Sequence, residues 1–233
     1  MRAVHLVTRL NVGGIARYLE AGRAAVDLLL RGRAPRGETE ASWNGPQAVL
    51  PGLGRPVHLL HDARAFAGLA ARLRRARCGV LHTHASKAGA LGRAAARLLG
   101  IPVVHTFHGH VLDGYFKGAA ARAVVLAEKV LARSGLVTAT GPATAADLEG
   151  RLGVPVSVLP PGVALPPAPP GARERWRRSL GSPERVALAV GRAAAVKDHA
   201  RFAAAARAAG YLPVVAGAEA VRRVVEAAGP LGI

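Results

Sequence analysis

The chain contains a single cysteine, Cys78, among its 233 residues. One thiol excludes an internal disulfide framework and is typical of proteins kept in a reducing compartment. The sequence has no uncharged apolar run of about 18 residues, as a membrane-spanning helix would need. The first apolar stretch is short and is interrupted by Arg9, which argues against a signal peptide. These features predict a cytoplasmic protein.

Aromatic and acidic residues are also scarce. Aromatic residues make up 4% of the chain while 51% of all residues are hydrophobic, so a large core must be built from Ala, Leu and Val. Asp and Glu number 14 against 32 Lys and Arg, which gives a formal net charge of +18. An Arg- and Ala-rich composition can reflect GC-rich coding alone. The charge otherwise suits an anionic membrane surface, which would place the protein peripherally at the inner membrane face, or a phosphorylated substrate.

Nucleic acid is not an expected partner. The Arg residues are spread along predicted helix faces and form no single basic run, and no nucleic-acid-binding motif accompanies them.

The most informative stretch is residues 78–116, which reads as strand, loop, helix, strand and loop. The apolar run 78–82 leads into His82-Thr83-His84, residues 86–99 have helical spacing, and Gly100 ends that helix. A second apolar run at 103–104 leads into HTFHGH at 105–110. The strands of such a βαβ unit are parallel, so both histidine-rich loops should meet at the carboxyl edge of the sheet, where ligands bind.

Residues 3–8 predict a first strand, followed by the loop Gly13-Gly14 and a helix over 15–30. Glycines allow close approach of an anion to the backbone, and the helix N-terminus offers free N–H groups. The same glycines can also serve turn geometry alone. Residues 31–56 are rich in Gly, Pro and charge, and only 47–50 resembles the second strand expected there.

The rest of the first half continues the alternation of strands and helices. We expect strands at 57–60, 135–140 and 155–159, and helices at 62–77, 118–132 and 142–153. Residues 160–171 contain six prolines in twelve positions, which excludes a helix or a central strand and predicts a linker. The sequence therefore predicts a Rossmann-like domain over 1–161 and a second domain over 172–233.

The second domain is expected to be incomplete. It opens with a basic helix at 172–180 and continues with strands at 186–190 and 212–216 and helices at 201–209 and 219–228. Two parallel strands make a poor independent sheet.

Five histidines are expected at one rim, namely His82, His84, His105, His108 and His110. Asp113 is the only carboxylate near them in sequence, so we expect no metal site there and no cofactor. A Ser or Cys nucleophile has no support, because Ser86 lacks a G-x-S-x-G context and Cys78 opens a strand away from the rim.

The motifs together resemble the family 4 glycosyltransferases, which have two facing Rossmann-like domains (the GT-B fold). The segments that carry the resemblance are HLVTRLNVGGIARYL (5–19), VLHTHASKAGALGRAAARLLGIPVVHTFHGHVLDGYF (80–116), PPGV (160–163) and VGRAAAVKDHARF (190–202). The resemblance implies transfer of a sugar from a nucleotide-sugar donor to a glycan or lipid-linked acceptor, with retention of configuration and without a metal. The first domain would chiefly hold the acceptor and the second the donor.

The resemblance also implies roles for individual residues. His108 would lie against the transferred sugar as the catalytic histidine. The donor diphosphate would be bound by Gly13, Gly14, Arg192 and Lys197. His84, Lys87 and His110 would line the acceptor side, with Lys87 available to an anionic acceptor.

One family feature is missing. The family has a Glu-x7-Glu pair late in the second domain, and no two Glu residues here are eight positions apart. We therefore keep a second reading open: a non-catalytic remnant that acts at most as a phosphate- or acceptor-binding Rossmann domain.

Overall fold

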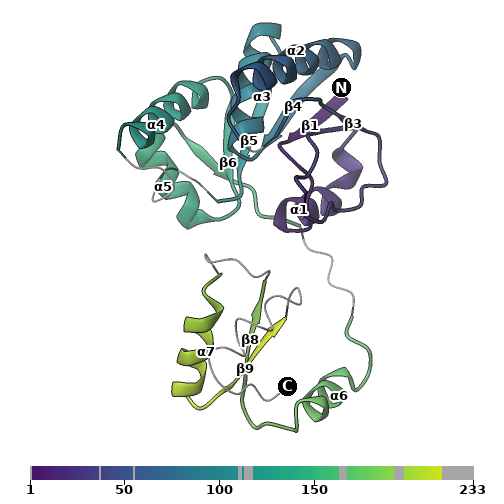
Figure 1. The fold of residues 1–233 in the computed structure, drawn as a ribbon, viewed down its shortest axis with the longest axis vertical. Helices are drawn as coiled ribbons and strands as arrows, with labels where there is room; N and C mark the ends of the chain where they lie inside the picture. Colours follow the sequence, from purple (N-terminus) through teal and green to yellow (C-terminus); the bar gives the residue numbers. More distant parts are fainter. Residues whose placement is uncertain are drawn as a thin grey trace. The chain divides into compact units, whose positions relative to one another are not determined.

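The chain forms two compact units, residues 1–164 and 165–233 (Figure 1). A computed structural model describes residues 2–36, 38–54, 56–109, 112, 118–162, 167–191 and 197–216. The division between the units falls inside the proline-rich stretch 160–171, whose described residues belong to no helix or strand.

The first unit is built on a seven-stranded parallel sheet with the order β3-β2-β1-β4-β5-β6-β7. Its strands are β1 (Arg2–Val7), β2 (Leu28–Arg31), β3 (Gln47–Val49), β4 (Cys78–His84), β5 (Val103–Phe107), β6 (Leu136–Ala139) and β7 (Val156–Val158). The order grows outward from β1 in both directions, so the switch point lies between β1 and β4. All strands are parallel, and their carboxyl ends lie along one edge of the sheet.

Right-handed crossovers place the helices on both faces of this sheet. Helix α1 (Gly14–Ala21) leads from β1 to β2 in one direction. The other helices lead in the opposite direction and so cover the other face; they are α2 (Leu59–Arg75), α3 (Ser86–Leu99), α4 (Gly118–Ala132) and α5 (Pro142–Leu152). Figure 1 shows α2 and α3 side by side on the face away from α1.

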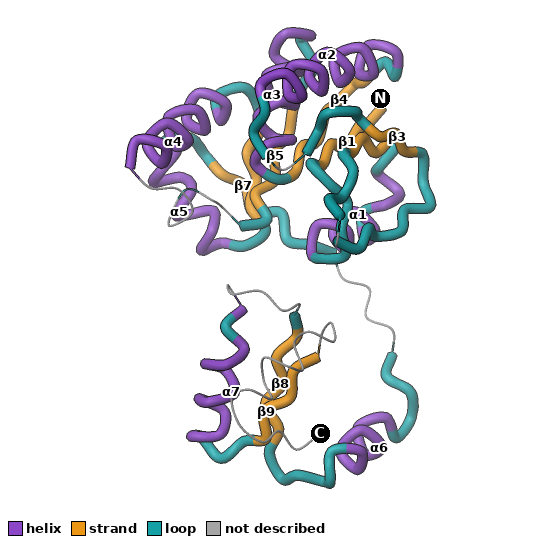
Figure 2. Tube along the Cα trace, in the orientation of Figure 1, coloured by secondary structure: helices purple, strands orange, loops and turns teal. Residues whose placement is uncertain are grey.

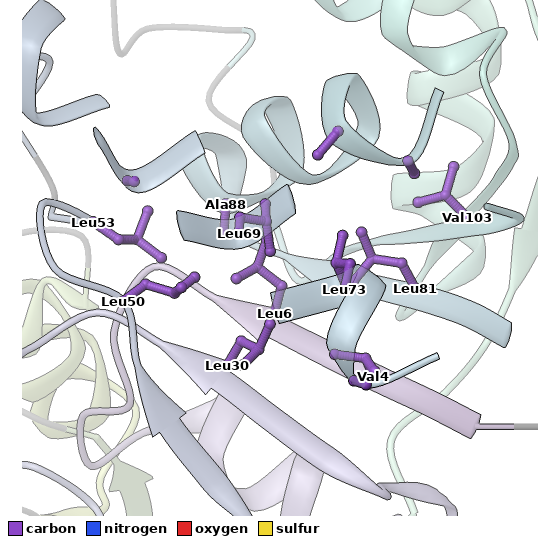
Figure 3. Close-up of a cluster of buried hydrophobic side chains, with 14 residues drawn as sticks. Val4, Leu6, Leu30, Leu50, Leu53, Leu69, Leu73, Leu81, Ala88 and Val103 are labelled. Atoms are coloured by element: carbon purple, nitrogen blue, oxygen red, sulfur yellow. The ribbon is translucent and has the colours of Figure 1, made fainter. Parts of the chain in front are cut away.

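The apolar core is divided by the sheet in the same way. The larger cluster lies between the central strands and helices α2 and α3, and includes Leu6, Leu69, Leu73 and Leu81 (Figure 3). Beneath α1, a second cluster contains Leu19, Leu29 and Trp43. Alternate residues of the central strands therefore face different cores, as the period of two in a strand requires.

The second strand was wrongly predicted. Helix α1 ends at Ala21, a 3₁₀ turn follows at Arg23–Ala25, and Leu28–Arg31 then forms β2 beside β1. Three consecutive leucines suit a helix by propensity, but here pairing with the central strand and burial decide the outcome. The carboxylate of Asp27 accepts a hydrogen bond from the Ala3 N–H at 2.7 Å, which helps to fix the register.

Two other expectations in this region need correction. The strand predicted near 47–50 exists, but it is the edge strand β3. The strand predicted at 57–60 does not form, because helix α2 begins at Leu59. If this segment were extended, no neighbouring strand would cover it. Its apolar side chains are exposed.

The second unit contains α6 (Ala172–Ser179), β8 (Val186–Val190), α7 (His199–Ala208) and β9 (Leu212–Ala216). Strands β8 and β9 are parallel and paired over their whole length, with α7 packed beside them (Figure 2). This confirms the predicted order of elements up to residue 216. The helix predicted over 219–228 lies outside the described residues.

Candidate functional site

The polar residues at the carboxyl ends of β1, β4, β5 and β6 are sorted by strand alternation onto two faces. On the face that α1 covers, His5 pairs in register with His82. Two residues further along β4, His84 pairs with Thr106, which in turn pairs with Thr138. The opposite face receives Thr83 and His105. The residues of the HTH and HTFH motifs therefore lie on two different faces of the sheet.

On the first face, side chains of β1, β4, β5 and β6, together with His108, form two short hydrogen-bonded chains. His84 is central: its Nε2 lies 3.1 Å from Nδ1 of His5, and its Nδ1 lies 2.9 Å from Nε2 of His108. His82 Nε2 lies 2.6 Å from the Thr106 hydroxyl. That hydroxyl in turn lies 2.7 Å from the hydroxyl of Thr138. We call His5, His82, His84 and His108 the histidine cluster.

Helix α1 covers the cluster with Tyr18. The Tyr18 ring stands edge-on to His108, with ring centroids 4.8 Å apart, and edge-on to His84 at 5.6 Å. Burial raises the pKa of the Tyr18 phenol, and a hydrogen bond with Thr106 opposes that rise. Sequence reasoning missed both Tyr18 and His5, because neither belongs to the HTH or HTFHGH motif.

Burial keeps the histidine cluster uncharged at neutral pH. It lowers the pKa of His5 and of His108 to about 4 and that of His82 to about 3. His84 is fully buried, and its pKa is held well below the ordinary 6.5 by burial and by the neighbouring histidines. His108 therefore offers a neutral imidazole that can donate or accept a hydrogen bond.

The predicted glycine loop stands at the N-terminus of α1, the helix whose Tyr18 packs against the cluster. Gly13 is the N-cap residue, and its carbonyl accepts from the Arg17 N–H at 3.2 Å. A side chain on Gly14 would meet no atom within 4 Å, so the first unit leaves open space there. The loop is held by the segment 38–41: Val12 N–H donates to Thr39 O at 3.0 Å, and Ala41 N–H donates to Leu10 O at 2.9 Å.

The loop that leads into α3 has an unusual backbone. Ala85 has φ 66°, and its methyl side chain cannot cap the helix. The hydroxyl of Thr8, the residue after β1, accepts from the Ala88 N–H at 3.1 Å and supplies the missing cap. Lys87, predicted to meet the acceptor, makes an ion pair with Asp62 at 2.5 Å and donates to the Pro56 carbonyl.

The opposite face is a packed interior. His105 was expected at the rim, but its side chain is buried against α3 and its Nδ1 lies 2.8 Å from the Thr83 hydroxyl. A Cβ on Gly89 would stand 2.3 Å from the His105 ring. Behind it, Arg93 and Glu128 form a buried ion pair at 2.6 Å. Strand alternation explains why His105 does not join the histidine cluster.

A cavity of about 520 Å³ opens at the same carboxyl edge, near β2 and β3. Arg33, His61 and Arg64 line it together with residues 49–54. Next to it, the start of α2 exposes Val57 (90%), Leu59 (84%) and Leu60 (74%). Because residues 31–56 show little helical or strand periodicity, the sequence did not predict this cavity.

In the second unit, Lys197 follows strand β8 and is exposed. Its aliphatic chain lies about 3.5 Å from the space that a Cβ on Gly191 would occupy. Asp198, with φ 41°, caps helix α7 by accepting from the Arg201 N–H. Arg192 and His110 were also predicted as site residues. Both lie outside the described residues.

Most of the chain is similar in sequence to known glycosyltransferases. The model of Glycosyltransferase Family 4 matches residues 12–166. Over 201 residues the chain is 33% identical to a D-inositol 3-phosphate glycosyltransferase of Acidothermus cellulolyticus, covering 81% of this chain and 44% of that protein. Over 65 residues it is 43% identical to the UDP-Gal:alpha-D-GlcNAc-diphosphoundecaprenol alpha-1,3-galactosyltransferase of Escherichia coli, covering 28% and 17%. The chain spans less than half the length of either relative.

Solved structures show the same fold. Sucrose-phosphate synthase of Thermosynechococcus elongatus matches with a TM-score of 0.70 and 16% identity, over 97% of this chain and 67% of that one. Anabaena HepE, solved in complex with UDP and glucose, matches with a TM-score of 0.68 and 17% identity, over 98% and 64%. The predicted α/β fold class of GT-B type is thereby confirmed.

Proposed function

The chain belongs to glycosyltransferase family 4, and from that premise we propose that it transfers a glycosyl group from a nucleotide-sugar donor to an acceptor. The observation that carries the proposal is the neutral His108 imidazole, held by His84 at the carboxyl edge of the sheet. Tyr18 of α1, the helix that starts at the open Gly13-Gly14 loop, stands against it. The named relatives support a donor of this class, since one uses UDP-Gal and one solved neighbour binds UDP and glucose.

The transfer breaks the bond between the anomeric carbon and the diphosphate oxygen, so negative charge grows on the leaving group. In our proposal Arg192 and Lys197 stabilise that charge, with the N–H groups at the start of α1 beside Gly13 and Gly14. The acceptor hydroxyl passes its proton to the departing diphosphate oxygen as its own oxygen takes the glycosyl group, with retention of configuration and with no metal ion on the diphosphate. His108 hydrogen-bonds to the transferred sugar and fixes its orientation.

We further propose that the acceptor is a glycan carried on a phosphorylated lipid. The cavity lined by Arg33, His61 and Arg64 suits a phosphate or diphosphate group. The exposed Val57, Leu59 and Leu60 beside it suit the boundary of an anionic membrane. One named relative acts on a diphosphoundecaprenol-linked sugar. None of the described helices is long and apolar enough to cross a membrane.

Calorimetry with UDP and a panel of nucleotide sugars tests donor binding. We expect binding that weakens at least tenfold when Arg192→Ala and Lys197→Ala are combined, because two cations are removed from the diphosphate. Arg178→Ala with Arg207→Ala serves as a control of equal charge change. A folded chain that binds no nucleotide would favour the second reading, an acceptor-binding Rossmann domain without transfer.

Flotation with lipid vesicles tests the membrane surface. Vesicles rich in phosphatidylglycerol should bind the chain, and Leu59→Asp with Leu60→Asp should abolish that binding. Leu126→Asp with Val130→Asp changes two exposed apolar residues of α4 and should leave binding intact. Equal loss in both double variants would contradict the assignment of this surface.

A further inference from the structure

Three imidazoles of the histidine cluster converge in a way that the histidine-rich motifs alone did not reveal. One ring nitrogen each from His5, His82 and His84 lies within 4.8 Å of the other two. They come from neighbouring positions on two adjacent strands, since His5 pairs with His82 and His84 lies two residues further along β4. The pairing of β1 with β4 fixes their backbone positions.

One pair of these nitrogens already has the spacing that a tetrahedral metal ion requires. With metal–nitrogen distances of about 2.0–2.1 Å, two ligand nitrogens lie about 3.3 Å apart. Nδ1 of His5 and Nε2 of His84 are already 3.1 Å apart. His82 is only half-buried, so a small rotation of its ring can bring its nitrogen to the same distance.

In two of the three histidines the second ring nitrogen is positioned as metal-binding histidines usually require. Ligating imidazoles commonly hydrogen-bond through their second nitrogen, which fixes the tautomer and the ring orientation. Here Nδ1 of His84 is 2.9 Å from His108, and Nε2 of His82 is 2.6 Å from Thr106. Nδ1 of His82 therefore remains as its ligand atom.

We propose that His5, His82 and His84 bind one divalent transition-metal ion of the zinc class, with the fourth position open to water. The sequence-based prediction of no metal site considered the five rim histidines, His105 among them, with Asp113 as the only nearby carboxylate. The structure turns His105 to the other face and brings His5 into the cluster in its place.

The ion would act on His108 through His84. Ligation at Nε2 of His84 requires the proton to sit on Nδ1, which then donates to Nε2 of His108. His108 is left with its proton on Nδ1 and in a single orientation. His5, His82 and His84 are in this sense positioning residues, and the ion has no role on the donor diphosphate.

Equilibrium dialysis of the untagged chain against Zn²⁺, followed by elemental analysis, tests the proposal. We expect about one equivalent of zinc per chain, and an at least tenfold weaker affinity in His5→Gln and in His82→Gln. His58→Gln is the matched control, because His58 stacks on His61 in an exposed pair that could bind zinc adventitiously. Zinc that persists in His5→Gln and His82→Gln, or that is lost in His58→Gln, would overturn the proposal.

A spectroscopic measurement on the unaltered chain guards against variants that fail to fold. Loading with Co²⁺ should give the intense visible absorption of a four-coordinate site, and X-ray absorption of the zinc form should fit three imidazole ligands. A six-coordinate cobalt spectrum or a fit with one imidazole would refute the assignment even if every variant were unfolded.

Discussion

Acidification in the presence of a chelator should destabilise the first unit, because the histidine cluster is buried in its neutral form. In the unfolded chain each imidazole has a pKa near 6.5, whereas in the folded chain the pKa of His5 and His108 is about 4 and that of His82 about 3. The unfolded state therefore binds more protons below pH 6.5. Stability is fully present above that pH and falls as the pH drops toward the folded-state values.

The size of the effect follows from these values. At pH 5, about 1.5 below the ordinary pKa, each buried histidine lowers the free energy of unfolding by about 2 kcal/mol, at about 1.36 kcal/mol for each tenfold change in proton concentration. His5, His82 and His108 together should therefore lower the free energy of unfolding by about 6 kcal/mol between pH 7.5 and pH 5.

Urea unfolding followed by Trp43 fluorescence measures this quantity. Trp43 is buried in the first unit and Trp176 is exposed in the second, so a Trp176→Phe background isolates the first unit. His5→Gln should reduce the loss of stability by about 2 kcal/mol, whereas His58→Gln should not change it. A total loss below about 1 kcal/mol, or an unchanged loss in His5→Gln, would refute the reasoning.

The opposite face of the sheet gives further predictions. Gly89→Ala should lower the free energy of unfolding by about 1–3 kcal/mol, because its Cβ would contact the buried His105 ring. Gly150→Ala on α5 has open space for its Cβ, so it should be neutral or stabilising by up to about 1 kcal/mol. Thermal unfolding of both variants checks this. Glu128→Gln should cost about 3–5 kcal/mol by leaving Arg93 buried without its partner, and Glu128→Leu with Arg93→Met should recover most of that loss in the same assay.

Much of the fold follows from local pattern. Helix α3 and its flanking strands were predicted to within a few residues, because periodicity, Gly100 and Pro102 all point to the same boundaries. Strand β2 was missed because Leu28, Leu29 and Leu30 satisfy a helix equally well until β1 is present to pair with them. Non-local pairing is not visible in a short window of sequence.

The candidate site shows the same limit. His84 and His108 were predicted from their motifs, and the structure brings them together. His5 and Tyr18 come from β1 and α1 and carry no local signal. His105 was placed with the others because all the histidines follow strands, yet its position in the alternation sends it to the opposite face.

The central claim is that His108 stands at a glycosyl-transfer site. Release of UDP from a UDP-sugar in the presence of a lipid-diphosphate-linked acceptor, measured for the unaltered chain, His108→Ala and His58→Ala, tests it most directly. We expect acceptor-dependent release that falls at least a hundredfold in His108→Ala and is unchanged in His58→Ala. Equal release by the unaltered chain and by His108→Ala, with both proteins folded, would contradict the claim.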